Sequence, residues 1–151
     1  MNTHPQSGYT HLMYALHALA GIIGITSSAT VAGAFVFGLP SILAILMNYA
    51  RRGAVRGSWI ESHFLWQART FWTALVVLVA LFAIALALAI IGVLGLLLTP
   101  LTGGASAVGA GVSFAGAYLA LTVGAFAAGL WILYRVIRGW MALRDGRAMN
   151  V

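Results

Sequence analysis

The chain has 151 residues, of which 62% are hydrophobic and 7% are charged, and its formal net charge is +6 at pH 7. A soluble domain contains about 25% charged residues, so eight arginines, Glu61 and Asp145 are too few to cover a surface in water. The composition therefore predicts a single integral membrane domain, residues 1–151. The sequence has no cysteine, which excludes disulfides, thiolate nucleophiles and iron–sulfur clusters.

Residues 1–8 are polar and contain neither Arg nor Lys, so they predict neither a cleaved signal nor a lipid anchor. Residues 9–50 carry no permanent charge and would form a helix of about 63 Å, whereas a bilayer core of about 30 Å needs about 20 residues. Polar residues at 26–28 therefore divide the run into two membrane segments, 9–26 and 29–50, joined as a hairpin. The alternative is a first segment that lies in the interface or re-enters the membrane without crossing it.

The second half of the chain has a similar organisation. A second charge-free run is divided by Pro100 and a glycine-rich stretch at 103–111, which predicts a flexible turn. The pattern predicts an all-α polytopic bundle of four transmembrane helices in two hairpins, or of three helices if the first run crosses once. The remaining predicted parts are a cytoplasmic connection at 51–69, membrane segments at 70–98 and 112–134, and a cytoplasmic helix end and tail at 135–151.

The arginines predict the orientation. All eight lie in two groups, at 51–69 and 135–147, and most tryptophans flank these groups. Cytoplasmic loops are enriched in Arg and Lys, and aromatic residues mark the interfaces, so we expect both termini in the cytoplasm. Because the charges stand at the ends of apolar segments, the expected partners are anionic lipid headgroups and other membrane subunits rather than nucleic acid.

A cluster of polar side chains is expected at the cytoplasmic interface. Ser58 and Glu61 have the spacing of a capping box, in which each side chain bonds the other residue's backbone amide. His63 and Gln67 are four residues apart and share a helix face. A proton-carrying Glu61 and a metal-bound His63 are the alternatives, but neither has a partner nearby in the sequence. The predicted cluster contains Glu61, His63, Gln67, Arg135 and Arg138.

His11 and His17 lie in the first apolar segment and are six residues apart. This spacing separates them by about 240° around a helix, so they are poorly placed to share one metal. Hydrogen bonds to neighbouring carbonyls are the expected role. An axial haem ligand at His17 is the alternative.

Small residues recur at every fourth position of the last membrane segment. Such a ridge lets another helix backbone approach closely. Internal packing, with Ala83 and Ala87 as mates, is the expected use, and contact with another subunit is the alternative. The ridge consists of Gly116, Ala120, Gly124 and Ala128.

The sequence lacks the patterns of a phosphate-binding loop, a serine nucleophile elbow and a zinc-binding helix. Residues 70–134 also lack the ionisable side chains that coupled carriers keep inside the membrane. We therefore expect a protein that is not an enzyme, with no catalytic, cofactor-binding or metal-binding residue.

Two blocks of the sequence resemble a known family. The first reads MNYARR at 47–52 and VRGSWIESHFLWQARTFW at 55–72, and the second reads YRVIRGW at 134–140 and LRDGR at 143–147. These residues, about a quarter of the chain, resemble a family of small bacterial inner-membrane proteins without an assigned function, which is grouped distantly with the chloroplast inner-envelope protein-import component. The resemblance implies a four-helix protein of the bacterial inner membrane.

The expected function is that of an accessory or structural subunit, or an assembly factor, of a larger membrane complex. The distant kinship suggests an alternative, a component of an oligomeric translocation or transport pore. A haem-binding electron carrier is a third hypothesis.

Overall fold

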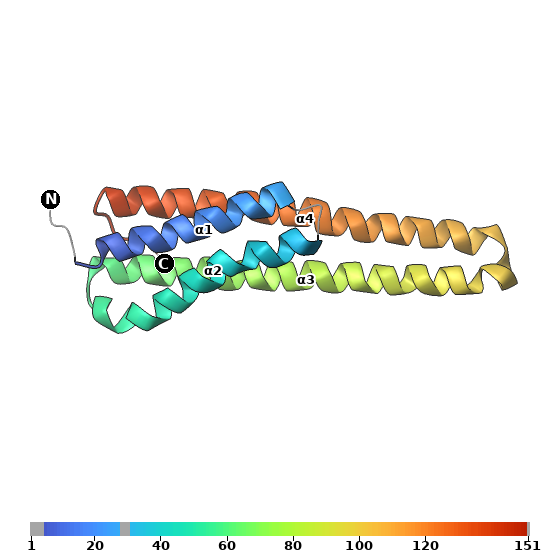
Figure 1. Ribbon diagram of the computed structural model, residues 1–151, viewed down its shortest axis with the longest axis horizontal. Helices are drawn as coiled ribbons and strands as arrows, with labels where there is room; N and C mark the ends of the chain where they lie inside the picture. The colour runs from blue at the N-terminus through green and yellow to red at the C-terminus, as the bar shows by residue number, and fades with distance from the viewer. Residues whose placement is uncertain (1–4, 28–30, 151) are drawn as a thin grey trace.

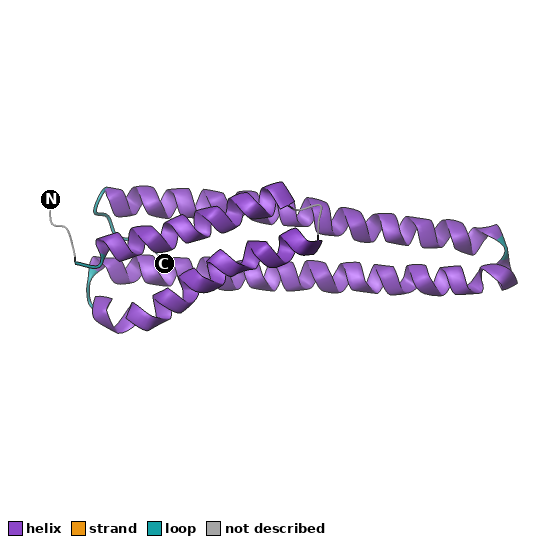
Figure 2. Cartoon of the chain, viewed as in Figure 1, coloured by secondary structure: helices purple, strands orange, loops and turns teal. Residues whose placement is uncertain are grey.

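The computed structural model describes residues 5–27 and 31–150. These residues form helices joined by turns, with no strand among them, so the predicted all-α fold is confirmed (Figure 2). The elements in chain order are α1 (Ser7–Ser27), α2 (Val31–Arg51), the 3-10 helix η1 (Arg52–Val55), α3 (Trp59–Thr102) and α4 (Gly104–Arg144).

The helices are of two lengths. α3 has 44 residues and α4 has 41, which makes each of them more than 60 Å long at about 1.5 Å per residue. α1 and α2 have 21 residues each and are about half as long. Figure 1 shows that α3 and α4 form a long antiparallel hairpin, while α1 and α2 lie against one half of it. We call the part of α3 and α4 nearest Gly103, residues 85–102 and 104–120, the distal hairpin, and the rest of the described residues the proximal half.

Glycines set the distance between α1 and α4. A Cβ atom on Gly129 would lie 2.8 Å from the Ile25 side chain, and one on Gly21 would lie 2.8 Å from Leu133. A Cβ atom on Gly139 would lie 2.5 Å from the Tyr14 hydroxyl. Residue numbers in these contacts rise along α1 as they fall along α4, so the two helices are antiparallel. Ile25, near the end of α1, packs against Gly129 of α4. Gly129 lies six residues before Arg135 on that helix.

The structure differs from the predicted flexible turn at 103–111. α3 continues through Pro100 to Thr102, and α4 begins at Gly104, so Gly103 alone connects them. Gly103 has φ +70° and ψ −157°, a conformation that favours glycine because it has no Cβ atom. A Cβ atom on Gly95 would lie 3.1 Å from the Ser106 carbonyl oxygen. The small residues of this stretch therefore allow close helix packing, which a turn-forming composition alone does not reveal.

The predicted connection at 51–69 is also mostly helical. α2 continues to Arg51, η1 follows, and α3 begins at Trp59, so a short turn at 56–58 separates the helices. Gly57 occupies this turn with φ +74°. Arg51 and Arg52 therefore lie where α2 meets η1, Arg56 lies in the turn, and Arg69 lies within α3. The end of α2 and the start of α3 lie beside the end of α4 (Figure 1).

Within the described residues, α3 and α4 are each long enough and apolar enough to cross a membrane. Their most apolar parts are little buried inside the molecule. Large hydrophobic side chains face outward along both helices, including Leu97 at 68% exposure and Val108 at 69%.

Candidate functional site

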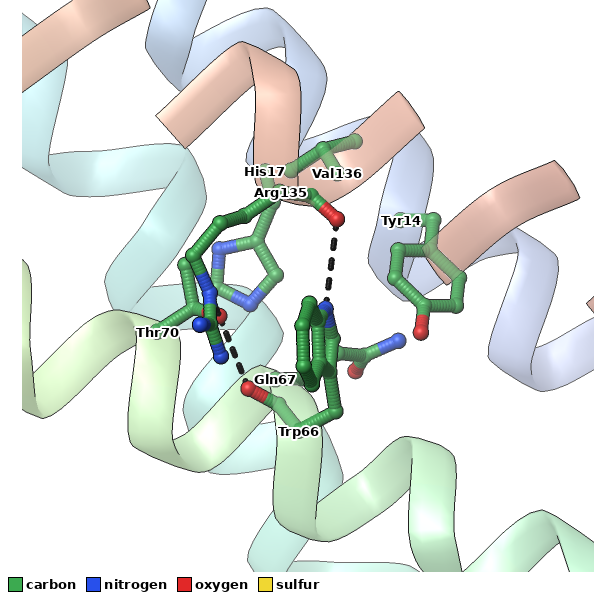
Figure 3. A pocket seen from close by; sticks show the side chains of 7 residues that line it. All are labelled: Tyr14, His17, Trp66, Gln67, Thr70, Arg135 and Val136. Atoms are coloured by element: carbon green, nitrogen blue, oxygen red, sulfur yellow. Dashed lines mark hydrogen bonds between the residues drawn. The ribbon is translucent and has the colours of Figure 1, made fainter. Parts of the chain in front are cut away.

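Buried polar side chains gather where α1, α3 and α4 meet. We call this group the polar cluster, and Figure 3 shows most of it around a narrow crevice. The crevice has no room for a water-sized molecule. The polar cluster consists of Tyr14, His17, His63, Trp66, Gln67, Thr70 and Arg135.

His63 is the centre of the hydrogen bonding. Its Nδ1 atom lies 2.9 Å from the Tyr14 hydroxyl, and its Nε2 atom lies 2.8 Å from the Arg147 carbonyl oxygen. A carbonyl oxygen only accepts, so Nε2 carries the hydrogen and Nδ1 accepts one from Tyr14. Both side chains are fully buried. His63 therefore joins α1, α3 and the segment after α4, which are far apart in the sequence.

Gln67 and His17 are buried with unsatisfied polar atoms. Both polar atoms of the Gln67 amide and Nε2 of His17 have no hydrogen-bond partner among the described residues. Nδ1 of His17 lies 3.2 Å from the Ser41 hydroxyl of α2. Unsatisfied groups of this kind are rare and costly in folded proteins.

Arg135 is held by aromatic rings and one hydroxyl. Its guanidinium carbon lies 3.6 Å from the centroid of Trp66 and 5.3 Å from that of Trp131. Its Nε atom donates to the Thr70 hydroxyl at 2.8 Å, and its carbonyl accepts from Trp66 Nε1 at 3.2 Å. Cation–π contacts of this kind are strongest where the charge is partly desolvated. They fix the guanidinium without neutralising it.

The five residues of the predicted interfacial cluster are only partly brought together. His63, Gln67 and Arg135 belong to the polar cluster. Arg138 lies at its edge, with its guanidinium carbon 5.6 Å from the Trp66 ring centroid. Glu61 instead accepts a hydrogen bond from the Gly57 amide at 2.8 Å. The ion pairs between acids and arginines in the described chain involve Asp145 and not Glu61.

The predicted capping box is wrong in detail. The Ser58 hydroxyl donates to the Val55 carbonyl at 2.6 Å and makes no capping bond to α3. Glu61 does reach back, but to Gly57 rather than to Ser58. The Val55 carbonyl, at the end of the 3-10 turn before α3, accepts both the backbone amide and the hydroxyl of Ser58.

The small-residue ridge faces α3 of the same chain. A Cβ atom on Gly124 would lie 2.6 Å from Leu81, and one on Gly116 would lie 3.5 Å from Leu88. Ala128 is buried and Ala120 is half-buried. The predicted mates were wrong, since Ala83 and Ala87 are exposed and leucines fill the space instead.

Other polar contacts of the proximal half were missed by the sequence analysis. Tyr9 donates to the Met47 carbonyl at 2.8 Å, and Asn48 donates to the Phe64 carbonyl at 2.9 Å. Trp140 Nε1 donates to His11 Nδ1 at 2.7 Å. The sequence did carry a signal for the α1 side of the polar cluster: Tyr14 stands three residues from both His11 and His17, so the three side chains follow one side of α1.

The polar cluster connects α1, α3 and α4 around a crevice that has no room for a water-sized molecule. His63 and Tyr14 of this cluster are bonded to each other. The described part of the chain also holds no group of three His, Cys, Asp or Glu side chains that could hold a metal ion.

Comparisons with models of protein families, with curated proteins and with solved structures gave no match.

Proposed function

We propose that this chain is a non-enzymatic integral membrane protein that serves as an accessory or structural subunit, or an assembly factor, of a larger membrane complex. The observation that carries the proposal is the distal hairpin, whose large apolar side chains face outward over a pair of packed helices. Water cannot cover such a surface without a large hydrophobic cost. Lipid and the helices of other membrane proteins are the environments that it fits.

The arrangement of charge supports the orientation of this hairpin. Both arginine groups lie at the end of the bundle opposite Gly103, and no charged residue lies between 70 and 134. The positive-inside rule then puts the arginine end and both termini in the cytoplasm, and Gly103 on the opposite side. The family resemblance supports the bacterial inner membrane as the location of the protein.

The α1/α2 hairpin fits a re-entrant segment better than a crossing. Ile25, near the end of α1, packs on Gly129 of α4, which is six residues, or about 9 Å, beyond Arg135. A membrane core is about 30 Å thick. α1 ends at Ser27, two residues beyond Ile25, so this helix reaches about 12 Å past Arg135 and enters the core without crossing it. Two crossings, by α3 and α4, therefore replace the four expected from the sequence in this proposal.

The geometry gives less support to a pore component or to a haem-binding electron carrier. A pore needs a polar surface across the membrane, but Thr99, Ser113 and Thr122 donate to carbonyls of their own helices. A haem held by His17 needs space beside its ring, and the adjoining crevice has none. His11 and His63 are each hydrogen-bonded to an aromatic side chain.

Site-specific photo-crosslinking in native membranes tests the proposal. A photoreactive residue at Leu97 or Val108, both outward-facing, should give a protein adduct of defined size. The matched control is Ala85, which is 4% exposed and should crosslink only within the chain. The proposal fails if outward positions around both helices of the distal hairpin yield lipid adducts alone.

A further inference from the structure

A groove lies between α4 and the chain segment that follows it. One side is formed by side chains between positions 134 and 142, and the other by residues 147–150. Its volume is about 440 Å³, which is within the roughly 300–1,000 Å³ of ligand sites in proteins. In the proposed orientation this groove lies at the cytoplasmic end of the molecule, where a soluble segment can reach it. We call it the α4 groove.

The segment after α4 has one bonded side and one unpaired side. The Arg147 carbonyl accepts from His63 Nε2 at 2.8 Å, and the Met149 amide donates to the Ser62 hydroxyl at 2.9 Å. Ala148, between them, is exposed and lines the groove, and its amide and carbonyl have no hydrogen-bond partner in the described chain. Such alternation is typical of an edge strand. An edge of this kind can pair with another extended chain.

The α4 side of the groove combines apolar side chains with a positive charge. Ile137 is 55% exposed and Met141 is 52% exposed. Arg138 is exposed as well. Its side chain lies 3.5 Å from the Tyr134 hydroxyl and 5.6 Å from the Trp66 ring centroid, and neither contact neutralises its charge. A carboxylate is the group that a guanidinium binds most strongly in such a setting.

The acids of this chain are engaged elsewhere. Asp145 pairs with Arg144 and Arg147, and Glu61 accepts from the Gly57 amide. The sequence has no other acidic side chain. A second copy of the chain would therefore bring no free carboxylate side chain to the groove, and the occupant that fits must come from a different molecule.

We propose that the α4 groove binds an extended segment of another protein, in which a carboxylate side chain stands two residues from a large apolar one. The backbone of this segment pairs with Ala148, its carboxylate pairs with Arg138, and its apolar side chain lies on Ile137 and Met141. In strand addition of this type, backbone bonds give affinity and alternate side chains give specificity. The inference rests on the proposed function, which puts the groove in the cytoplasm and gives the chain a partner.

Fluorescence anisotropy with the purified full chain in detergent tests the inference. The probe is a labelled peptide of seven residues, with threonine at odd positions and glutamate, leucine and glutamate at even positions. This order puts the acidic and apolar side chains on one face of an extended chain. The peptide should bind, and a matched peptide with lysine in place of glutamate should not. Equal binding of the two peptides, or no binding of either, would overturn the proposal.

Two variants locate the binding in the groove. Arg138→Gln should weaken it by about tenfold or more, because a charge-assisted bond is lost. Ala148→Pro removes the unpaired amide and should weaken it by about threefold or more. Both residues are exposed, so the fold should persist, and an unchanged thermal transition verifies it. The control is Arg56→Gln, which removes the same charge from an exposed turn outside the groove and should bind as the parent does.

Three outcomes would contradict the proposal. Equal losses in Arg138→Gln and Arg56→Gln would show diffuse attraction, and unchanged binding by Ala148→Pro would show that no strand is added. Displacement of the peptide by glycerol phosphate at equal concentration would show that the groove takes a phosphate or a lipid headgroup instead. The assay uses no membrane partner, so a negative result leaves the crosslinking from Leu97 and Val108, and with it the subunit proposal, to be judged separately.

Discussion

At the scale of single residues, the molecule concentrates its polar bonds where the arginines lie. Tyr14, His63 and the Arg147 carbonyl form one chain of hydrogen bonds that crosses three separate segments. The sequence indicated His63 but not its partners, because Tyr14 lies 49 residues away and spacing within one helix carries no information about contacts between helices. The neighbours of Gln67 were missed for the same reason.

Tyr14→Phe should destabilise the protein by about 1–3 kcal/mol, because it leaves the buried Nδ1 atom of His63 without a donor. Thermal unfolding in detergent measures the change. The matched control is Tyr49→Phe, whose hydroxyl accepts from Trp72 Nε1 at an exposed position. Equal effects of the two substitutions would mean that the bond between Tyr14 and His63 contributes little.

Glu61→Ala should cost about 0.5–2 kcal/mol, the usual range for a lost contact at a helix start, because it removes the acceptor of the Gly57 amide. Arg138→Ala should change stability by about 1 kcal/mol or less, since its contacts are exposed. The two variants are compared by the same unfolding measurement. A larger loss from Arg138→Ala would contradict this order.

At the scale of helices, composition predicted the helix class and most helix positions, whereas packing decided where the helices end. Pro100 and the glycines after it are typical of a turn, yet α3 and α4 continue to Gly103 from both sides. Gly95, Ser106 and the small residues near them allow the helices to approach closely. This close packing stabilises the helix ends only when α3 and α4 lie side by side. The sequence of the segment alone therefore predicted a long turn.

Gly124→Ile should destabilise the isolated protein by about 1–3 kcal/mol or more, because even a Cβ atom there would lie 2.6 Å from Leu81. Val123→Ile is the control: Val123 is 61% exposed and can accept another methylene. Unfolding in detergent, without any partner, measures both. If Gly124→Ile stays as stable as its control but loses a co-purifying protein, the ridge serves another subunit and not α3.

At the scale of the whole molecule, two halves have different interactions. The proximal half is held by hydrogen bonds and cation–π contacts between helices. The distal hairpin is held by apolar packing such as that of Phe114 against Gly92, with hydroxyl bonds of Ser106 to Thr99 and Thr102 at its end. This division suits a protein whose polar end lies at the membrane surface and whose apolar end lies in lipid. The sequence predicted the division from its charges, but not the short reach of α1, which depends on its register with α4.

The most direct test of this account is single-cysteine labelling in intact cells with a reagent that does not cross the membrane. The chain has no native cysteine, so one cysteine at a time can replace Gly104, Gly57 or Thr26 without background. The account predicts that Gly104→Cys is labelled from outside, Gly57→Cys only after the cells are opened, and Thr26→Cys not from outside. Labelling of Thr26→Cys from outside as readily as Gly104→Cys would show that α1 and α2 cross the membrane, and a silent Gly104→Cys would contradict the crossing by α3 and α4.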